Sequence, residues 1–119
     1  MADTFTTFVM EILDKSGKEL MAAEDEQART YELYMKAIDK CHQYQKQIDD
    51  YERHMVKYKD RTDIPKKISE MREKMVQYKC AERETKLAHE NATMLVAILD
   101  MKRNPEYIFE QAKAAGFLF

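Results

Sequence analysis

Residues 34–58 read YMKAIDKCHQYQKQIDDYERHMVKY, and apolar or aromatic side chains recur in them at alternating intervals of three and four residues. The side chains in this register are Tyr34, Ala37, Cys41, Tyr44, Ile48, Tyr51, Met55 and Tyr58. An α-helix completes a turn about every 3.6 residues, so this spacing places all of them on one side of a helix. The pattern predicts a long helix that forms a coiled-coil-like seam with a second helix.

The second helix is expected after the helix-breaking residues 61–65, Arg-Thr-Asp-Ile-Pro. Proline fits the first turn of a helix, where its missing N–H group costs nothing, so a new helix is expected from residue 64. Its apolar positions are Ile68, Met71, Met75 and Tyr78, followed after a shift of one position by Ala81, Thr85, Ala88, Ala92, Leu95 and Leu99. The shift predicts a stammer, which overwinds a supercoil locally.

Folding the chain back at residues 61–62 brings the two apolar series together in antiparallel order. The expected neighbours are Met55 with Ile68, Tyr51 with Met71 or Arg72, Ile48 with Met75, Tyr44 with Tyr78, Cys41 with Ala81 and Tyr34 with Ala88. A bulky ring that faces a small residue keeps the packed volume even along the seam. Because this complementarity lies within one chain, we expect an intramolecular hairpin rather than a parallel dimer of extended helices.

Further helix boundaries are expected at Ser16-Gly17, Asn104-Pro105 and Gly116. Asn104 is a suitable N-cap, and Gly116 is suited to the position just after a helix. We expect helices at 4–15, 18–60, 64–103 and 105–115, with the alternative that Gly17 only kinks one longer first helix. The predicted fold is all-α: a long antiparallel helical hairpin, or stalk, with short N- and C-terminal helices packing into an apolar head. One domain is expected over 1–119, with the stalk at about 30–92 and the head formed by about 4–27 with 93–119.

The composition favours a soluble helical protein. The 119 residues include two Gly and two Pro, 35% are charged, and the net charge is −2. No apolar run approaches the roughly 18 residues of a membrane-spanning helix, and the first residues do not read as a signal peptide. We therefore expect an intracellular, cytoplasmic protein without a membrane partner. Two cysteines, Cys41 and Cys80, are too few for a disulfide framework and are expected to stay reduced.

No constellation of residues predicts catalysis, a cofactor or a metal. The histidines are His42, His54 and His89. Asp39, before His42, is the only carboxylate residue that stands three positions before a histidine. A helical di-iron site needs a Glu-x-x-His motif on two helices and two further Glu residues. The sequence has no glycine-rich phosphate loop and no G-x-S-x-G motif. We predict no catalytic, cofactor-binding or metal-binding residues and no enzyme activity.

The apolar residues of the head come from the two chain ends. The candidate partner-binding residues are Phe5, Phe8, Ile12, Tyr107, Phe109, Phe117, Leu118 and Phe119. The final aromatic residues either complete the head of their own chain or fill a groove on another one. The segment 94–101 is apolar on nearly all sides, and a helix of that kind needs more than one neighbour. So much apolar surface in a small head predicts a protein partner and, most simply, a homodimer.

The tip of the hairpin carries an excess of basic residues. The candidate phosphate-binding residues are Lys57, Lys59, Arg61, Lys66 and Lys67. Such a tip either binds phosphates in a salt-sensitive way or only keeps the turn solvated. The leading hypothesis is a non-enzymatic structural or adaptor subunit that acts through homo-oligomerisation and protein contacts at the head. The alternatives are a small helical chaperone for an apolar client segment and a nucleic-acid-binding accessory protein that uses the tip.

Overall fold

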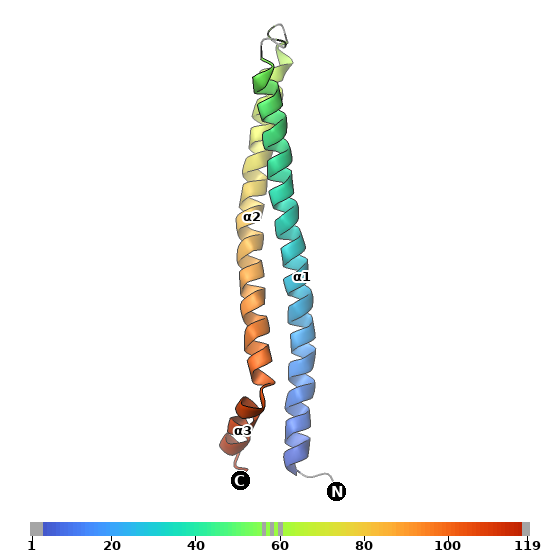
Figure 1. The fold of residues 1–119 in the computed structure, drawn as a ribbon, viewed down its shortest axis with the longest axis vertical. Coiled ribbons are helices and arrows are strands. Elements are labelled where there is room, and N and C mark those ends of the chain that lie inside the picture. Colours follow the sequence, from blue (N-terminus) through green and yellow to red (C-terminus); the bar gives the residue numbers. More distant parts are fainter. Residues whose placement is uncertain (1–3, 56, 58, 60, 118–119) are drawn as a thin grey trace. The chain divides into compact units, whose positions relative to one another are not determined.

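The computed structural model describes residues 4–55, 57, 59 and 61–117. These residues form the helices α1 (Thr4–Arg53), α2 (Asp63–Lys102) and α3 (Pro105–Ala114), and they contain no strand. The long helices α1 and α2 pack together as an antiparallel hairpin, and α3 follows α2 (Figure 1). The predicted all-α hairpin is therefore confirmed. None of the described helices combines the length and the apolar character that crossing a membrane requires.

The chain divides into two compact units. The hairpin unit is Thr30–Ala88, and the terminal unit combines Met1–Arg29 with His89–Phe119. Both long helices contribute to both units, because α1 and α2 each continue through the boundary. Each unit has buried side chains of its own.

The core of the hairpin unit is a cluster of aliphatic side chains between α1 and α2. It contains Ile48, Ile64, Ile68 and Met75, with Tyr44, Tyr51 and Met71 packed against them. The rings of Tyr44 and Tyr78 stack with their centroids 5.8 Å apart. The predicted neighbours Ile48 with Met75 and Tyr44 with Tyr78 are therefore confirmed. Full burial of one aliphatic side chain of this size contributes about 1.5–3 kcal/mol, so this cluster is a major source of stability.

Helix α1 ends at Arg53, so the predicted extension to residue 60 is wrong. The N–H of Met55 bonds to the carbonyl of Glu52 (3.4 Å), the shorter i→i+3 pattern found at many helix ends. Met55, predicted to lie in the seam, is 48% exposed. Ile64, which the prediction left out, is buried instead in the first turn of α2 and joins the core there. The predicted seam residue Tyr58 lies outside the described residues.

The seam side of α2 runs without the predicted stammer. Its buried and half-buried residues include Ile64, Ile68, Met71, Met75, Tyr78, Glu82, Thr85, His89, Ala92, Val96 and Leu99, at alternating intervals of four and three. Ala88 and Leu95, predicted in the seam, are exposed. At these two positions the prediction chose Ala88 and Leu95 for the seam because they are apolar. In the structure the next residues along the chain, His89 and Val96, are half-buried in their place. Regular heptad spacing, rather than polarity alone, therefore determines which residues lie in this seam.

Cys41 occupies a buried seam position, whereas Cys80 is exposed. Burial raises the pKa of the Cys41 thiol, and the nearby Glu82 carboxylate raises it further, against a smaller opposite effect of Lys79. The thiol therefore stays protonated and acts as a small apolar side chain.

Replacing Ile48 or Met75 with alanine is expected to lower the free energy of unfolding by about 2–4 kcal/mol, because each change removes buried methylene groups and leaves a cavity. Both residues belong to one cluster, so urea unfolding of the double mutant should reveal a coupling energy of about 0.5 kcal/mol or more. Met55→Ala is the matched control. Because Met55 is exposed, its truncation should change the unfolding free energy by less than about 0.5 kcal/mol. Equal losses from Met55→Ala and Met75→Ala would place the core elsewhere.

Candidate interaction surfaces

In the terminal unit α1 continues through Ser16 and Gly17, so the predicted separate helix at 4–15 is wrong and the alternative of one longer helix is correct. The Ser16 hydroxyl donates to the carbonyl of Ile12 (2.7 Å), which satisfies this buried polar group within the helix. A Cβ atom at Gly17 would lie 2.7 Å from Nη1 of Arg103. Glycine at this position therefore makes room for another side chain and does not end the helix.

Arg103 ties the residues just after α2 to α1. Its Nη1 donates to the carbonyl oxygen of Leu13 (2.6 Å) and to the hydroxyl oxygen of Ser16 (3.3 Å). A charged donor makes a stronger hydrogen bond than a neutral one. Because both acceptors are uncharged, this contact depends on the close approach that Gly17 allows rather than on an ion pair.

The predicted start of α3 at Pro105 is confirmed, and the helix ends at Ala114, one residue before the predicted end. The side chain of Asn104 accepts a hydrogen bond from the backbone of the first turn, and Pro105 is the first helical residue. After the helix, Gly116 has a φ of +98°, a conformation that glycine adopts without strain. The N–H of Phe117 bonds to the carbonyl of Ala112 (3.0 Å), and the N–H of Gly116 bonds to residue 113 (3.0 Å). This pair of bonds is a Schellman motif, which turns the chain sharply after a helix.

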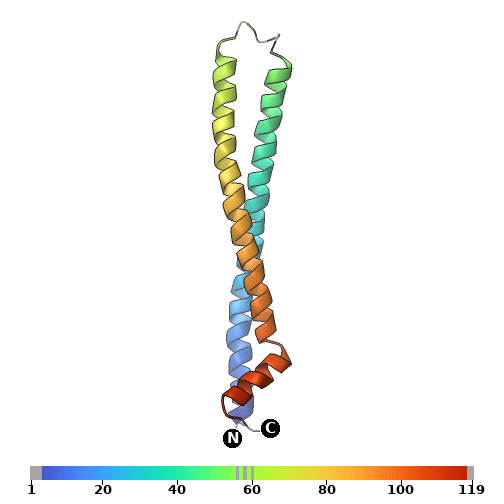
Figure 2. The ribbon, with the colours of Figure 1, turned by 90° about the vertical axis from the view of Figure 1, so that its left-hand side faces the viewer.

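Figure 2 shows the C-terminal end of α3 beside the start of α1. The ring of Phe117, just after the turn, packs there against rings of the first turns of α1. The centroid of its ring lies 5.6 Å from that of Phe5 and 5.1 Å from that of Phe8. All three rings are half-buried. These predicted partner-binding residues therefore complete the terminal unit of their own chain, and a contact of their exposed edges with a partner stays a prediction.

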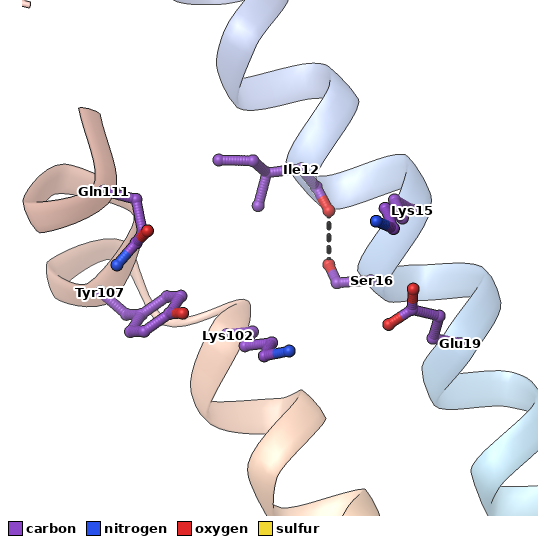
Figure 3. A pocket seen from close by; sticks show the side chains of 7 residues that line it. All are labelled: Ile12, Lys15, Ser16, Glu19, Lys102, Tyr107 and Gln111. Atoms are coloured by element: carbon purple, nitrogen blue, oxygen red, sulfur yellow. Dashed lines mark hydrogen bonds between the residues drawn. The ribbon is translucent and has the colours of Figure 1, made fainter. Parts of the chain in front are cut away.

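Two other predicted partner-binding residues, Ile12 and Tyr107, line a hollow of about 210 Å³ in the terminal unit. Figure 3 shows its full lining: Ile12, Lys15, Ser16, Glu19, Lys102, Tyr107 and Gln111. Apolar, hydroxyl, amide and charged groups all line this hollow, so its wall is not a continuous apolar surface. Among the described residues, no group of three or more His, Cys, Asp or Glu side chains is placed to hold a metal ion.

Phe109 is the most exposed of the predicted partner-binding residues that the structure describes, at 38%. The ammonium group of Lys113 lies 4.7 Å from the centroid of its ring, within reach of a cation–π interaction. The ring is therefore partly covered by its own helix. The remaining two predicted residues, Leu118 and Phe119, lie outside the described part of the chain.

The most exposed apolar surface on consecutive turns of the terminal unit lies on α2. Met94, Leu95, Ile98 and Met101, here named the α2 outer face, are 63%, 47%, 43% and 54% exposed. Ala92 and Leu99 of the same turns are buried. The sequence showed that this segment is apolar on nearly all sides, but the prediction gave the partner contacts to the aromatic chain ends. The intervals of four and three between residues 94, 98 and 101 are the signal that could have found this face.

The predicted basic tip is partly neutralised by Asp63 in the first turn of α2. Nη2 of Arg61 lies 2.8 Å from one carboxylate oxygen, and Nζ of Lys67 lies 3.4 Å from the same oxygen. Lys57, Lys59 and Lys66 are exposed. Two of the five candidate phosphate-binding residues are thus engaged by a carboxylate, and phosphate or nucleic-acid binding at the tip stays a prediction.

The hairpin unit has an open apolar groove of about 550 Å³. Its lining is Leu33, Lys36, Ala37, Asp39, Lys40, Gln43, Tyr78, Ala81 and Thr85. Small residues stand on both helices here, Ala37 on α1 and Ala81 on α2, so neither side fills the space. The expected matching of a bulky residue with a small one therefore does not extend along the whole seam.

Replacing Gly17 with alanine combines two opposed effects. Alanine favours the helix by about 1 kcal/mol, but its Cβ displaces the Arg103 guanidinium, whose charged hydrogen bonds contribute about 1.5–3 kcal/mol. We therefore expect Gly17→Ala to leave the free energy of unfolding unchanged or to lower it. In an Arg103→Ala background the same change should raise it by about 1 kcal/mol, measured by chemical denaturation of all four proteins. A gain of about 1 kcal/mol in both backgrounds would contradict the close approach of Arg103.

The pKa of the Asp63 carboxyl is held below its ordinary value of 3.8, chiefly by hydrogen bonds from Arg61 and further by Lys67. A depressed pKa means that the carboxylate stabilises the fold above pH 3.8 and that this contribution is lost as the pH falls through the lowered pKa. NMR titration of the Asp63 side chain should give a midpoint below 3.8, and Arg61→Ala should raise it. Arg72→Ala is the control, since Arg72 pairs with Glu52. If the midpoint of Asp63 is the same in Arg61→Ala as in the natural chain, this ion pair does not form in solution.

Among the surfaces that the described residues form, the α2 outer face joins large apolar side chains to substantial exposure over consecutive turns. Comparisons of the chain with protein-family models, with curated proteins and with solved structures find no match.

Proposed function

We propose that this chain is a non-enzymatic helical interaction module, a structural or adaptor subunit that forms a homodimer and contacts protein partners through the α2 outer face. The observation that carries the proposal is the exposure of Met94, Leu95, Ile98 and Met101 on two successive turns of one helix. Exposed apolar side chains gathered in one patch typically mark an interface, whereas scattered ones do not.

The internal contacts of the terminal unit support this choice of surface. The ring of Phe117 packs against the rings of Phe5 and Phe8. These contacts already remove a large part of their apolar area from water. Met94 and Ile98, in contrast, remain 63% and 43% exposed in the single chain. Covering the second group therefore gains more free energy than covering the first.

The size of this gain limits what the α2 outer face can do alone. Full burial of a Met, Leu or Ile side chain contributes about 1.5–3 kcal/mol, and these four are only about half exposed, which leaves roughly 3–6 kcal/mol. Association costs about 4–15 kcal/mol in lost translational and rotational freedom. A stable homodimer therefore requires contacts beyond these four residues.

A small helical chaperone is the second candidate, and the exposed methionines favour it. Met10, Met21, Met94 and Met101 of the terminal unit are all more than half exposed. The unbranched thioether side chain adapts its shape to different partners, which suits a surface that binds varied apolar segments. A chaperone would suppress the aggregation of an unfolded client at equimolar amounts, whereas an adaptor subunit that dimerises through this face would not.

Ile98→Lys tests the proposed contact surface. A lysine buried within an apolar interface must lose its hydration, so we expect the protein to sediment as a monomer at micromolar concentration where the natural chain sediments as a dimer. Met21→Lys introduces the same charge at another exposed apolar position and should leave the dimer unchanged. Circular dichroism should show equal helix content in all three proteins. If Ile98→Lys dimerises like the natural chain, the α2 outer face is not the contact surface.

A further inference from the structure

The side of α2 that points away from the seam carries a second heptad series. Cys80, Leu87, Met94 and Met101 follow one another at intervals of seven residues, and all are exposed. Each stands two residues after a seam residue, namely Tyr78, Thr85, Ala92 and Leu99. Two residues correspond to about 200° around a helix, so this series lies on nearly the opposite side of α2 from the seam.

Two further apolar residues extend this series. Val76 and Ile98 are 61% and 43% exposed, and each stands eleven residues from Leu87, one on either side. Cys80 and Met94 stand seven residues from Leu87, again one on either side. Because all of these residues belong to the single helix α2, their order and angular positions follow from helical geometry alone. The part of the series from Val76 to Ile98 is therefore symmetric about Leu87. Met101 lies outside this symmetric part, because the position at equal distance before Leu87 is the charged Glu73.

Such symmetry makes a surface complementary to a reversed copy of itself. When two identical helices run antiparallel about a two-fold axis beside Leu87, each residue faces the one at equal distance on the other side of the centre. Leu87 then meets the partner's Leu87, Cys80 meets the partner's Met94, and Val76 meets the partner's Ile98. All of these contacts join apolar side chains.

The charges within the series favour the same arrangement. Arg83 and Glu90 are exposed and stand seven residues apart, about 10 Å along their own helix, which is too far for an ion pair with each other. Arg83 lies about 6 Å before Leu87 and Glu90 about 4.5 Å after it. Reversal about the two-fold axis brings Arg83 level with the partner's Asn91 and within about 1.5 Å, along the axis, of the partner's Glu90. Arg83 and Glu90 lie on the same side of the contact, so the symmetry makes this pair twice, whereas the partner's Glu84, level with Glu90, lies on the opposite side. A parallel pairing would instead place Arg83 beside the partner's Arg83.

We propose that a second copy of this chain is the occupant of this surface, packed antiparallel along α2 with Leu87 at the two-fold axis and with two Arg83–Glu90 ion pairs. The pairing rests on the proposed function in one respect, since it includes Met94 and Ile98 of the α2 outer face. It supplies the additional contacts that a stable homodimer requires, because the series from residue 76 to residue 98 is about 33 Å long at 1.5 Å per residue.

A charge exchange tests the register. Arg83→Glu and Glu90→Arg, each alone, place two like-charged pairs across the dimer and should raise its dissociation constant about tenfold in sedimentation or fluorescence dilution at low salt. The double exchange restores two opposite-charged pairs and should bring the constant back to within about twofold of the natural chain. The matched control is the exchange of Glu32 and Lys36, an exposed ion pair on α1, which should not change it. Failure of the double exchange to restore dimerisation would overturn the proposed register.

Disulfide cross-linking gives a second readout that does not depend on charge. Cys80 alone should not cross-link, because the two copies of Cys80 would lie about 21 Å apart along the helices. Met94→Cys should form a cross-linked dimer through Cys80 of the partner subunit under a mild oxidant such as copper phenanthroline, since facing positions meet the distance that a disulfide needs. Met101→Cys is the matched control: Met101 is also more than half exposed, but it lies about 10 Å from that cysteine along the axis.

The two proposals fail in different ways. Dimerisation that is abolished by Ile98→Lys, together with cross-linking of Met101→Cys but not Met94→Cys, would overturn the register while keeping the contact surface. A monomer that binds an amphipathic helix of another protein through Ile98 would also overturn the self-pairing alone. Cross-linking through Met94→Cys, with rescue by the charge exchange, would support both.

Discussion

Burial of one side of α2 against α1 is the interaction on which the rest of this chain depends. Long helices in water gain most of their stability from packing an apolar side against a neighbour rather than from intrinsic propensity. In the hairpin unit this burial is provided by the cluster around Ile48 and Met75 and by the stacked rings of Tyr44 and Tyr78. The ion pair between Glu52 and Arg72 joins the same two helices at their exposed edge and adds little free energy of its own.

The polar residues of the seam carry information about register. Glu82, Thr85 and His89 take half-buried positions on α2. Nδ1 of His89 lies 3.1 Å from the carbonyl oxygen of Gln27, and the Gln27 amide donates to the hydroxyl of Thr93 (3.1 Å). A shift of α1 along α2 by one turn would separate these groups from their partners, and two hydrogen bonds that only this register makes would be lost. Aliphatic contacts alone would tolerate such a shift far better.

Much of the fold could be predicted from the sequence, because helices with regular apolar spacing and few breakers leave little choice. The pairing of Ile48 with Met75 and the boundaries of α3 at Asn104 and Gly116 followed from local rules. The errors arose at residues whose structure depends on a contact with a distant part of the chain. Gly17 reads as a helix breaker until the approach of Arg103 is known. His89 reads as a surface residue until the regular spacing of the seam turns it inward.

The candidate site was less predictable for a related reason. Phe117 and Met94 are both apolar, and composition alone cannot tell which of them finds a partner within the chain. That outcome depends on the turn after α3, which brings Phe117 onto Phe5 and Phe8, while Met94 projects from the opposite side of α2 to the buried Ala92. Sequence patterns identify which residues need burial, whereas the path of the backbone selects those that obtain it.

The Schellman turn after α3 has a consequence for how this chain can vary. The position of Phe117 is set by the hydrogen bond from its N–H to the carbonyl of Ala112 and by the left-handed backbone at Gly116. Both are fixed relative to the start of the helix at Asn104. Inserting one residue into α3 would rotate its end by about 100° and advance it by about 1.5 Å, which would move the ring away from α1. The solvent-facing residues of α3 are free to change in identity, but the length of the helix is not free to change.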